Sequence, residues 1–496
     1  MIAGKLKVNL VYNLVGSILP ILSALATVPL YIHHIGVARY GIVSICWLLL
    51  GYFGFLDFGL SRASANALSK LSGAPAFERS PVIMTSFWMN LGLGTTAGLI
   101  MLVGSYGLLL HVFSIPMELR REVFTALPWM AAMLPFGMLG GVATGILESR
   151  DRFLTSNLLS SIGSVAGQLL PLIVAVFYSP TLPYVIPAML LARVAIVIAT
   201  FGVALRLEQP IRPFDFQLVW VRRLLGYGAW VSVSSLISPL LDGLDQMLIG
   251  VVLGASSVAH YAVPMNLALR SQLVAVALAR TLFPQLSRAD PTQARMLAGQ
   301  ACIALAYAFG AICGPAIIMC HAFLSVWIGP SFATTSAPVA VVLLLGAWPN
   351  GVAFIPYSLL QGQGRPDITA KVHLVEIVPF IAMLWWLMHQ FGLLGAAAAW
   401  TIRVAFDCVA LLILSKFPRP SFLKLLPALA LMLGSYGLAN AENHQSAIEA
   451  GIVGIMFVGL GFFIEPLFRK SAVSTFASVG RLWLPVQRKM LHALLK

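Results

Sequence analysis

The sequence predicts an all-α membrane protein that crosses the bilayer about fourteen times. Of its 496 residues, 59% are hydrophobic and 10% are charged, whereas a soluble domain is typically about 25% charged. The apolar residues form runs of about 20 or more, the length that a helix needs to span hydrocarbon. Helices satisfy their own backbone hydrogen bonds in lipid, and the short alternating segments of a transmembrane barrel are absent.

The predicted spans are short-looped and leave no room for a domain outside the membrane. The first begins after Lys5 and Lys7 and continues through Ile32, which favours a retained helix over a cleaved signal peptide. In order, the expected spans are 10–32, 41–60, 82–110, 123–147, 157–178, 183–206, 226–254, 258–286, 297–323, 336–360, 372–391, 393–415, 423–439 and 447–466.

The net charge of +14 follows the positive-inside pattern of membrane proteins. Alternate loops are basic, whereas the other set carries only Arg39, Arg120 and Arg121. We therefore expect both termini in the cytoplasm. The excess of basic residues is explained by the orientation of the chain in the membrane, with its basic loops on the cytoplasmic side. No nucleic-acid partner is therefore expected.

Two halves of the chain share short motifs at offsets between 208 and 221 residues. Val37-Ala38-Arg39-Tyr40 matches Val258-Ala259-His260-Tyr261, and Ala192-Arg193-Val194-Ala195 matches Ile402-Arg403-Val404-Ala405. Six spans per repeat give both lobes the same orientation, as in transporters built of parallel repeats that bind substrate near the midplane. The predicted organisation is an N-terminal lobe at 1–206, a cytoplasmic linker at 207–225, a C-terminal lobe at 226–416, two further helices at 417–466 and a basic cytoplasmic tail at 467–496.

Arginines inside the predicted spans are the main candidates for function, because charged groups in lipid are costly and usually face a cavity or a partner. Arg270 lies about 15 Å deep at 1.5 Å per residue. Its guanidinium suits a phosphate, although a structural pair with Asp245 explains it equally well. Arg193 has no acid four residues on, unlike Arg403, and Arg62 and Arg280 lie near the cytoplasmic face.

The acidic candidates are fewer. Asp242 and Asp245 share one helix face, and two carboxylates there should not both stay ionised without partners. They are either counter-ions for arginine or proton-coupling groups, and Asp57 lies near the cytoplasmic face. We expect Arg403 and Asp407 to neutralise each other at i,i+4, and Glu376 to be solvated or to neighbour Lys371.

No enzyme signature accompanies these residues. The sequence has no catalytic triad, metal-binding box or phosphate loop, so no cofactor and no metal are expected. The five cysteines fall in apolar runs and are interpreted as small apolar fillers. Gly92, Gly94 and Gly98 predict close helix packing rather than a nucleotide site.

The sequence resembles the polysaccharide flippases in three motifs. They are the G-V-A-R-Y-G turn, the L-D-F-G-L-S-R segment with Asp57 and Arg62, and the Ala-His-Tyr-Ala of 259–262. These are the Wzx-like, O-antigen-type branch of the multidrug/oligosaccharidyl-lipid/polysaccharide exporter superfamily. The six-plus-six-plus-two layout is similar too, and the resemblance covers most of the chain.

The resemblance implies translocation of undecaprenyl-diphosphate-linked oligosaccharide across the bacterial inner membrane, by alternating access around a cationic cavity. Arg62, Arg270, Arg280 and Arg193 would bind the diphosphate, while Asp57, Asp242 and Asp245 would position arginines or couple to an ion. The implied partners are the lipid-linked glycan, membrane lipids and the polysaccharide polymerase machinery. The alternatives are a peptidoglycan-precursor flippase, a multidrug/cation antiporter of the same fold and, less well supported, a membrane glycan polymerase or ligase.

Overall fold

A computed structural model describes residues 2–53, 60–71, 74–111, 117–150, 152–208, 212–225, 243–440, 447–466 and residue 469. The chain forms two compact units, Met1–Val263 and Pro264–Lys496, which are treated separately below. All regular structure in the described residues is helical. The all-α class predicted from the sequence is therefore confirmed.

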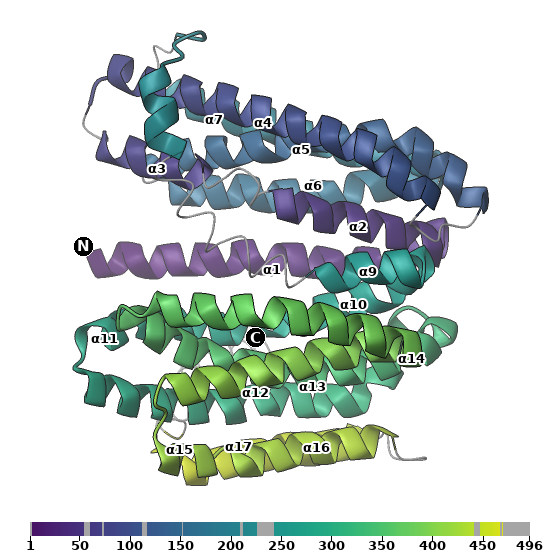
Figure 1. Ribbon diagram of the computed structural model, residues 1–496, viewed down its shortest axis with the longest axis vertical. Coiled ribbons are helices and arrows are strands. Elements are labelled where there is room, and N and C mark those ends of the chain that lie inside the picture. Colours follow the sequence, from purple (N-terminus) through teal and green to yellow (C-terminus); the bar gives the residue numbers. More distant parts are fainter. Residues whose placement is uncertain are drawn as a thin grey trace, which may run out of the picture. The chain divides into compact units, whose positions relative to one another are not determined.

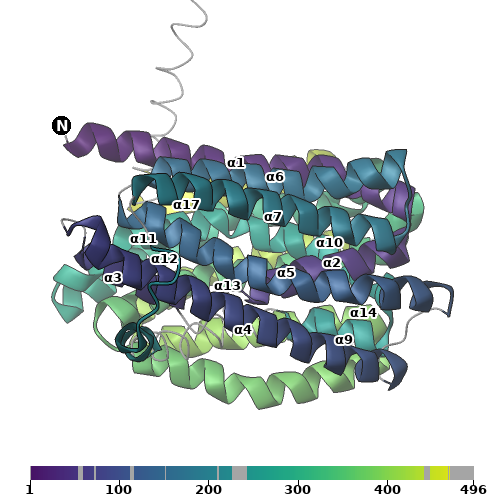
Figure 2. The ribbon, with the colours of Figure 1, turned by 90° about the horizontal axis from the view of Figure 1, so that it is seen from above.

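The first unit is a bundle of long helices that lie side by side. Contacts join α1 to α6, α6 to α7, α7 to α5 and α5 to α4, and Figure 2 shows this order across the unit. Its helices are α1 (Ile2–Ile35), α2 (Val37–Phe53), α3 (Leu60–Lys70), α4 (Ala76–His111), α5 (Met117–Ser149), α6 (Phe153–Phe177), α7 (Leu182–Leu207), α9 (Leu244–Val252) and the beginning of α10 (Ala255–Ser271).

The second unit centres on α13, which packs on both α12 and α14, and α16 and α17 lie against α12 (Figure 1). Its helices after α10 are α11 (Leu273–Arg288), α12 (Pro291–Trp327), α13 (Pro330–Gly362), α14 (Pro366–Leu414), α15 (Arg419–Leu423), α16 (Leu426–Asn440) and α17 (Ala447–Ile464). The predicted span 258–286 is divided between α10 and α11, which meet at Gln272.

Within the described residues, nine helices are long and apolar enough to cross a membrane. Two shorter apolar helices, Leu19–Ile35 and Val37–Leu48, accompany them. The polytopic membrane class is thereby confirmed, while the count of fourteen stays a prediction. The five cysteines are buried and free, in agreement with their interpretation as apolar fillers.

Helix α14 is two helices joined without a loop. Gly392 has φ +58° and ψ −133°, a conformation that interrupts the helix and strongly favours glycine. A Cβ on Gly395 would lie 1.9 Å from the carbonyl oxygen of Leu387, so the chain folds back on itself here. The two arms correspond to the predicted spans 372–391 and 393–415.

The described part of the predicted linker packs on the first unit. Trp88 of α4 donates to the carbonyl of Pro213 at 3.0 Å and stacks on Phe214. Leu224 is buried against Leu60 and Ala63. The two compact units meet at residue 263, which lies beyond this linker. The linker's role as a boundary between two six-helix lobes stays a prediction.

Glycines let α4 and α5 approach closely. A Cβ on Gly94 would lie 2.5 Å from Cα of Pro135, and one on Gly98 would lie 2.8 Å from the carbonyl oxygen of Ala131. Nothing lies within 4 Å of a Cβ on Gly92. The predicted close packing is therefore confirmed at Gly94 and Gly98, and it is not seen at Gly92.

Gly94→Ala is expected to destabilise the purified protein by about 1–3 kcal/mol, because its methyl group meets backbone that cannot rotate away. Thermal unfolding in detergent measures this. Gly92→Ala, two residues earlier in the same helix, is the matched control and should unfold like the parent. Equal behaviour of the two variants would contradict the close approach.

Candidate functional site

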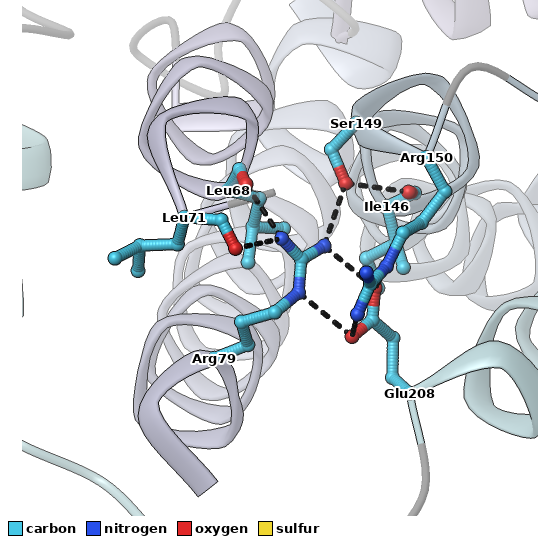
Figure 3. A network of polar contacts seen from close by, with 7 residues as sticks. All are labelled: Leu68, Leu71, Arg79, Ile146, Ser149, Arg150 and Glu208. Carbon is cyan, nitrogen blue, oxygen red and sulfur yellow. Dashed lines mark hydrogen bonds and ion pairs between the residues drawn. The ribbon is translucent and has the colours of Figure 1, made fainter. Parts of the chain in front are cut away.

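One end of the first unit is held by a buried ionic network, named here the Glu208 clasp and drawn in Figure 3. Arg79 of α4 is fully buried and donates from all five of its guanidinium N–H groups. Two bonds reach Glu208 at 2.6 and 2.8 Å, and the others reach the carbonyls of Leu68 and Leu71 and the hydroxyl of Ser149. The clasp thus joins α3, α4, α5 and the end of α7.

Arg150, just after α5, approaches Glu208 from the other side. Its Nε and Nη2 donate to the two carboxylate oxygens at 2.8 and 2.9 Å. Burial alone would raise the pKa of Glu208, but hydrogen bonds from Arg150 and Arg79 and their charges outweigh it and hold the pKa below its usual range. Glu208 is therefore an ionised carboxylate shared by two arginines.

A second network, the Glu122 clasp, ties the opposite ends of α5 and α7. Arg39 donates to both oxygens of Glu122 at 2.6 and 2.9 Å. Glu122 also accepts the first backbone N–H of α7, from Leu182, at 3.1 Å. Helices α5 and α7 therefore run parallel and are fastened at both ends.

Arg193 lies between the two clasps, eleven residues into α7, or about 16 Å along the helix axis. Its Nη2 donates to the carbonyl of Gly137 at 3.3 Å, and its Nε is buried without a hydrogen-bond partner. The guanidinium lies 3.6 Å from where a Cβ of Gly140 would be, so the two glycines of α5 make room for it. A guanidinium with donors to spare at this depth can bind an anionic oxygen.

Asp245 is fully buried in the first turn of α9. It accepts the hydroxyl of Tyr261 from α10 and the backbone N–H of Gln246 at 2.7 Å. These bonds anchor α9 against α10 within the first unit. Its predicted alternatives, arginine positioning and ion coupling, stay predictions.

The other predicted residues are placed less fully. Arg270 is half-buried in the last turn of α10. Arg62 lies in the first turn of α3 and Arg280 in α11, while their side chains fall outside what the structure describes. Asp57 and Asp242 are outside the described residues. The diphosphate-binding set therefore stays a prediction.

The second unit buries a polar group that the sequence interpretation missed. Glu376 was expected to be solvated or near Lys371, which is wrong: it is 5% exposed, and Lys371 pairs with Asp367 at 3.6 Å. Its neighbours on the same arm face the second arm of α14: Nε2 of His373 lies 3.6 Å from Oδ1 of Asp407, and the guanidinium carbon of Arg403 lies 5.1 Å from the ring centre of Phe380. Arg403 is 27 residues away from Glu376, so helical spacing within one helix cannot bring the two together. Gly392 lies between them, and a turn there could have suggested that the two arms of α14 pack on each other.

Comparison with solved structures shows which fold the chain has. The Lipid II flippase MurJ, in an inward closed conformation, superposes with a TM-score of 0.73 at 13% identity, covering 94% of this chain and 100% of that one. An inward-facing multidrug resistance MATE family transporter of the MOP superfamily gives a TM-score of 0.67 at 15% identity, covering 84% and 98%. The chain has the fold of these multi-pass membrane transporters.

Sequence comparison then gives the family. The family of polysaccharide biosynthesis proteins matches residues 6–290, and the "Putative O-antigen transporter" of Shigella flexneri is 30% identical over 408 residues, 81% of this chain and 96% of the relative. The uncharacterized membrane protein EpsK of Bacillus subtilis (strain 168) is 24% identical over 71% of this chain and 70% of EpsK. The chain belongs to the polysaccharide biosynthesis protein family, in its flippase-like branch, and is a multi-pass inner-membrane transporter rather than an enzyme.

Proposed function

We propose that this protein moves an undecaprenyl-diphosphate-linked oligosaccharide from the cytoplasmic to the outer leaflet of the bacterial inner membrane. The observation that carries the proposal is the identity of 30% to a protein named as an O-antigen transporter, extending over nearly all of that relative. Both termini would lie in the cytoplasm, as the basic loops favour. The glycan polymerase machinery would receive the product.

The chemistry of the substrate fits the basic side chains. A diphosphate carries two negative charges, and the planar fork of arginine donates two parallel hydrogen bonds to such oxygens. Arg193 has an unused buried donor at mid-helix. Arg62, Arg270 and Arg280 would complete the binding set, with Asp57, Asp242 and Asp245 as positioning or ion-coupling groups.

Alternating access of two lobes around a cationic cavity is the mechanism that we propose. Such a motion needs lobes that move as rigid bodies. The two clasps support this for the first unit, since they fasten α5 to α7 at both ends. The lipid tail would remain in the bilayer throughout.

Deletion of the gene is expected to leave lipid-linked oligosaccharide on the cytoplasmic leaflet and to remove surface glycan. Leaflet-specific enzymatic labelling of the glycan in spheroplasts and in inverted vesicles measures this. Cell lysis with accumulated peptidoglycan precursor would instead support the peptidoglycan alternative. Normal surface glycan with increased dye sensitivity would contradict the proposal and favour drug export.

A further inference from the structure

Residues 212–225 of the first unit form a surface element that is fastened to α4 and is named here the linker platform. Its helical part, 218–225, lies crosswise at the α3 end of the unit, in teal in Figure 1 and seen end-on in Figure 2. Two of its backbone N–H groups donate to hydroxyls of α4, Arg212 to Ser80 at 3.1 Å and Gln217 to Thr85 at 3.0 Å. These bonds, with the contacts of Trp88 described above, fix how the platform is turned on α4.

The linker platform packs through one face and exposes the other. Leu224 is buried on the inner face, against Leu60 and Ala63 of α3. The exposed side chains combine large apolar groups with arginines, and they include Arg212, Phe214, Leu218, Val219, Arg222 and Arg223. Phe214 is 85% exposed and Leu218 is 63% exposed. Such a face fits a partner that takes up apolar groups and positive charge together.

The charge of the linker platform indicates an anionic partner. Its sequence holds three arginines and one aspartate, a net charge of +2. Asp215 accepts from the side chain of Gln217 at 3.3 Å, and the guanidinium carbon of Arg223 lies 5.2 Å from the ring centre of Trp220. A phospholipid surface takes apolar side chains at the acyl boundary and arginines at its anionic headgroups. The long arginine side chains can reach those headgroups while their stems lie along apolar surface.

The position of the linker platform favours lipid over a soluble protein. The candidate membrane span of α4 is Phe77–Gly104. The groups of α4 that hold the platform, Ser80, Thr85 and Trp88, all lie near the beginning of this span. Tryptophan is enriched at the membrane–water interface. Lipid headgroups are therefore expected beside the platform wherever α4 enters the bilayer.

We propose that the linker platform docks on the anionic phospholipids of the cytoplasmic leaflet and thereby holds the beginning of α3 in place. Leu60 and Ala63, against which Leu224 packs, flank Arg62 of the proposed diphosphate-binding set. Lipid bound to the outer face of the platform would thus stabilise the helical turn that carries this arginine. The choice of leaflet and the effect on transport rest on the proposed function, whereas the lipid contact itself does not.

The lipid contact is tested first without transport. A Leu218→Cys variant of the full-length protein is labelled with bimane and placed in nanodiscs, since the five native cysteines are buried. Nitroxide-bearing phosphatidylglycerol should quench the label at least about threefold more than nitroxide-bearing phosphatidylcholine, because each arginine near an anionic surface adds to the attraction. This preference should disappear at about 1 M salt, where charges are screened within about 3 Å.

Arg222→Gln combined with Arg223→Gln should remove most of the preference for phosphatidylglycerol. The matched control is Arg152→Gln combined with Arg206→Gln, which removes two exposed arginines from the same end of the unit and should keep the preference. Equal quenching by both lipids in the labelled parent would overturn the proposal. Stronger quenching by aqueous iodide than by either lipid would also overturn it, and would make a soluble protein the better partner for the platform.

The effect on α3 is tested in proteoliposomes that contain lipid-linked oligosaccharide. Raising phosphatidylglycerol from none to about 30% of the lipid should accelerate translocation by the parent at least about threefold, and should not accelerate it in the variant that lacks Arg222 and Arg223. Parent flux that is independent of phosphatidylglycerol would overturn the role of the platform in holding α3. Selective quenching without translocation in any lipid would leave the lipid contact intact and reject the proposed function instead.

Discussion

Glu208→Ala is expected to destabilise the protein by about 3–5 kcal/mol, the usual cost of removing one partner from a buried ion pair. The substitution leaves Arg79 as an unpaired cation in a fully buried position and releases Arg150 from the end of α7. Thermal unfolding in detergent should show a large loss, accompanied by a lower yield of monodisperse protein.

Two controls separate the clasp from a general effect of charge. Glu148→Ala removes an exposed acid close to the clasp and should have little effect. Arg79→Leu combined with Glu208→Leu should cost less than the sum of the single variants, since no buried charge then lacks a partner. Additive losses would mean that the two side chains do not form one unit.

The Glu208 clasp also has a defined dependence on pH. Its carboxyl has a lowered pKa in the folded protein. The stabilisation is therefore complete above the unfolded value of about 4.3, and it is lost as the pH falls through the lower native value. Glu208→Gln should weaken this part of acid unfolding, which thermal scans at several pH values measure.

Arg193→Ala is expected to reduce transport about tenfold to a hundredfold with normal protein levels. A charge-assisted hydrogen bond contributes about 1.5–3 kcal/mol, and Arg193 has an unpartnered buried Nε that a diphosphate oxygen could accept from. Surface glycan in a complemented deletion strain gives the first measurement. Flux in proteoliposomes separates transport from expression.

The matched control lies on the same helix. Arg206→Ala removes an exposed arginine near the end of α7 and should complement fully. Arg193→Lys keeps the charge but loses the planar fork, so its activity should fall between those of the parent and of Arg193→Ala. Full complementation by Arg193→Ala would assign this arginine to packing beside Gly137 and Gly140.

The helical architecture could be predicted because hydropathy is a local signal. Runs of apolar residues gave the membrane class, and Gly392 falls between two predicted spans where α14 reverses. Contacts between distant residues could not be predicted in the same way. Arg79 and Glu208 are separated by 129 residues, and no local spacing in the sequence links them. Glu376 was misassigned because nearby Lys371 was its only visible candidate partner.

The glycine at the reversal of α14 has a consequence for engineering the protein. A side chain at Gly392 would introduce about 1–3 kcal/mol of backbone strain. The close approach of Gly395 to Leu387 also leaves no room to insert residues at this turn. Epitope tags and protease sites intended to report topology therefore belong elsewhere. Since both arms turn about one fixed hairpin, the distance between Glu376 and Asp407 should vary less than distances across ordinary loops.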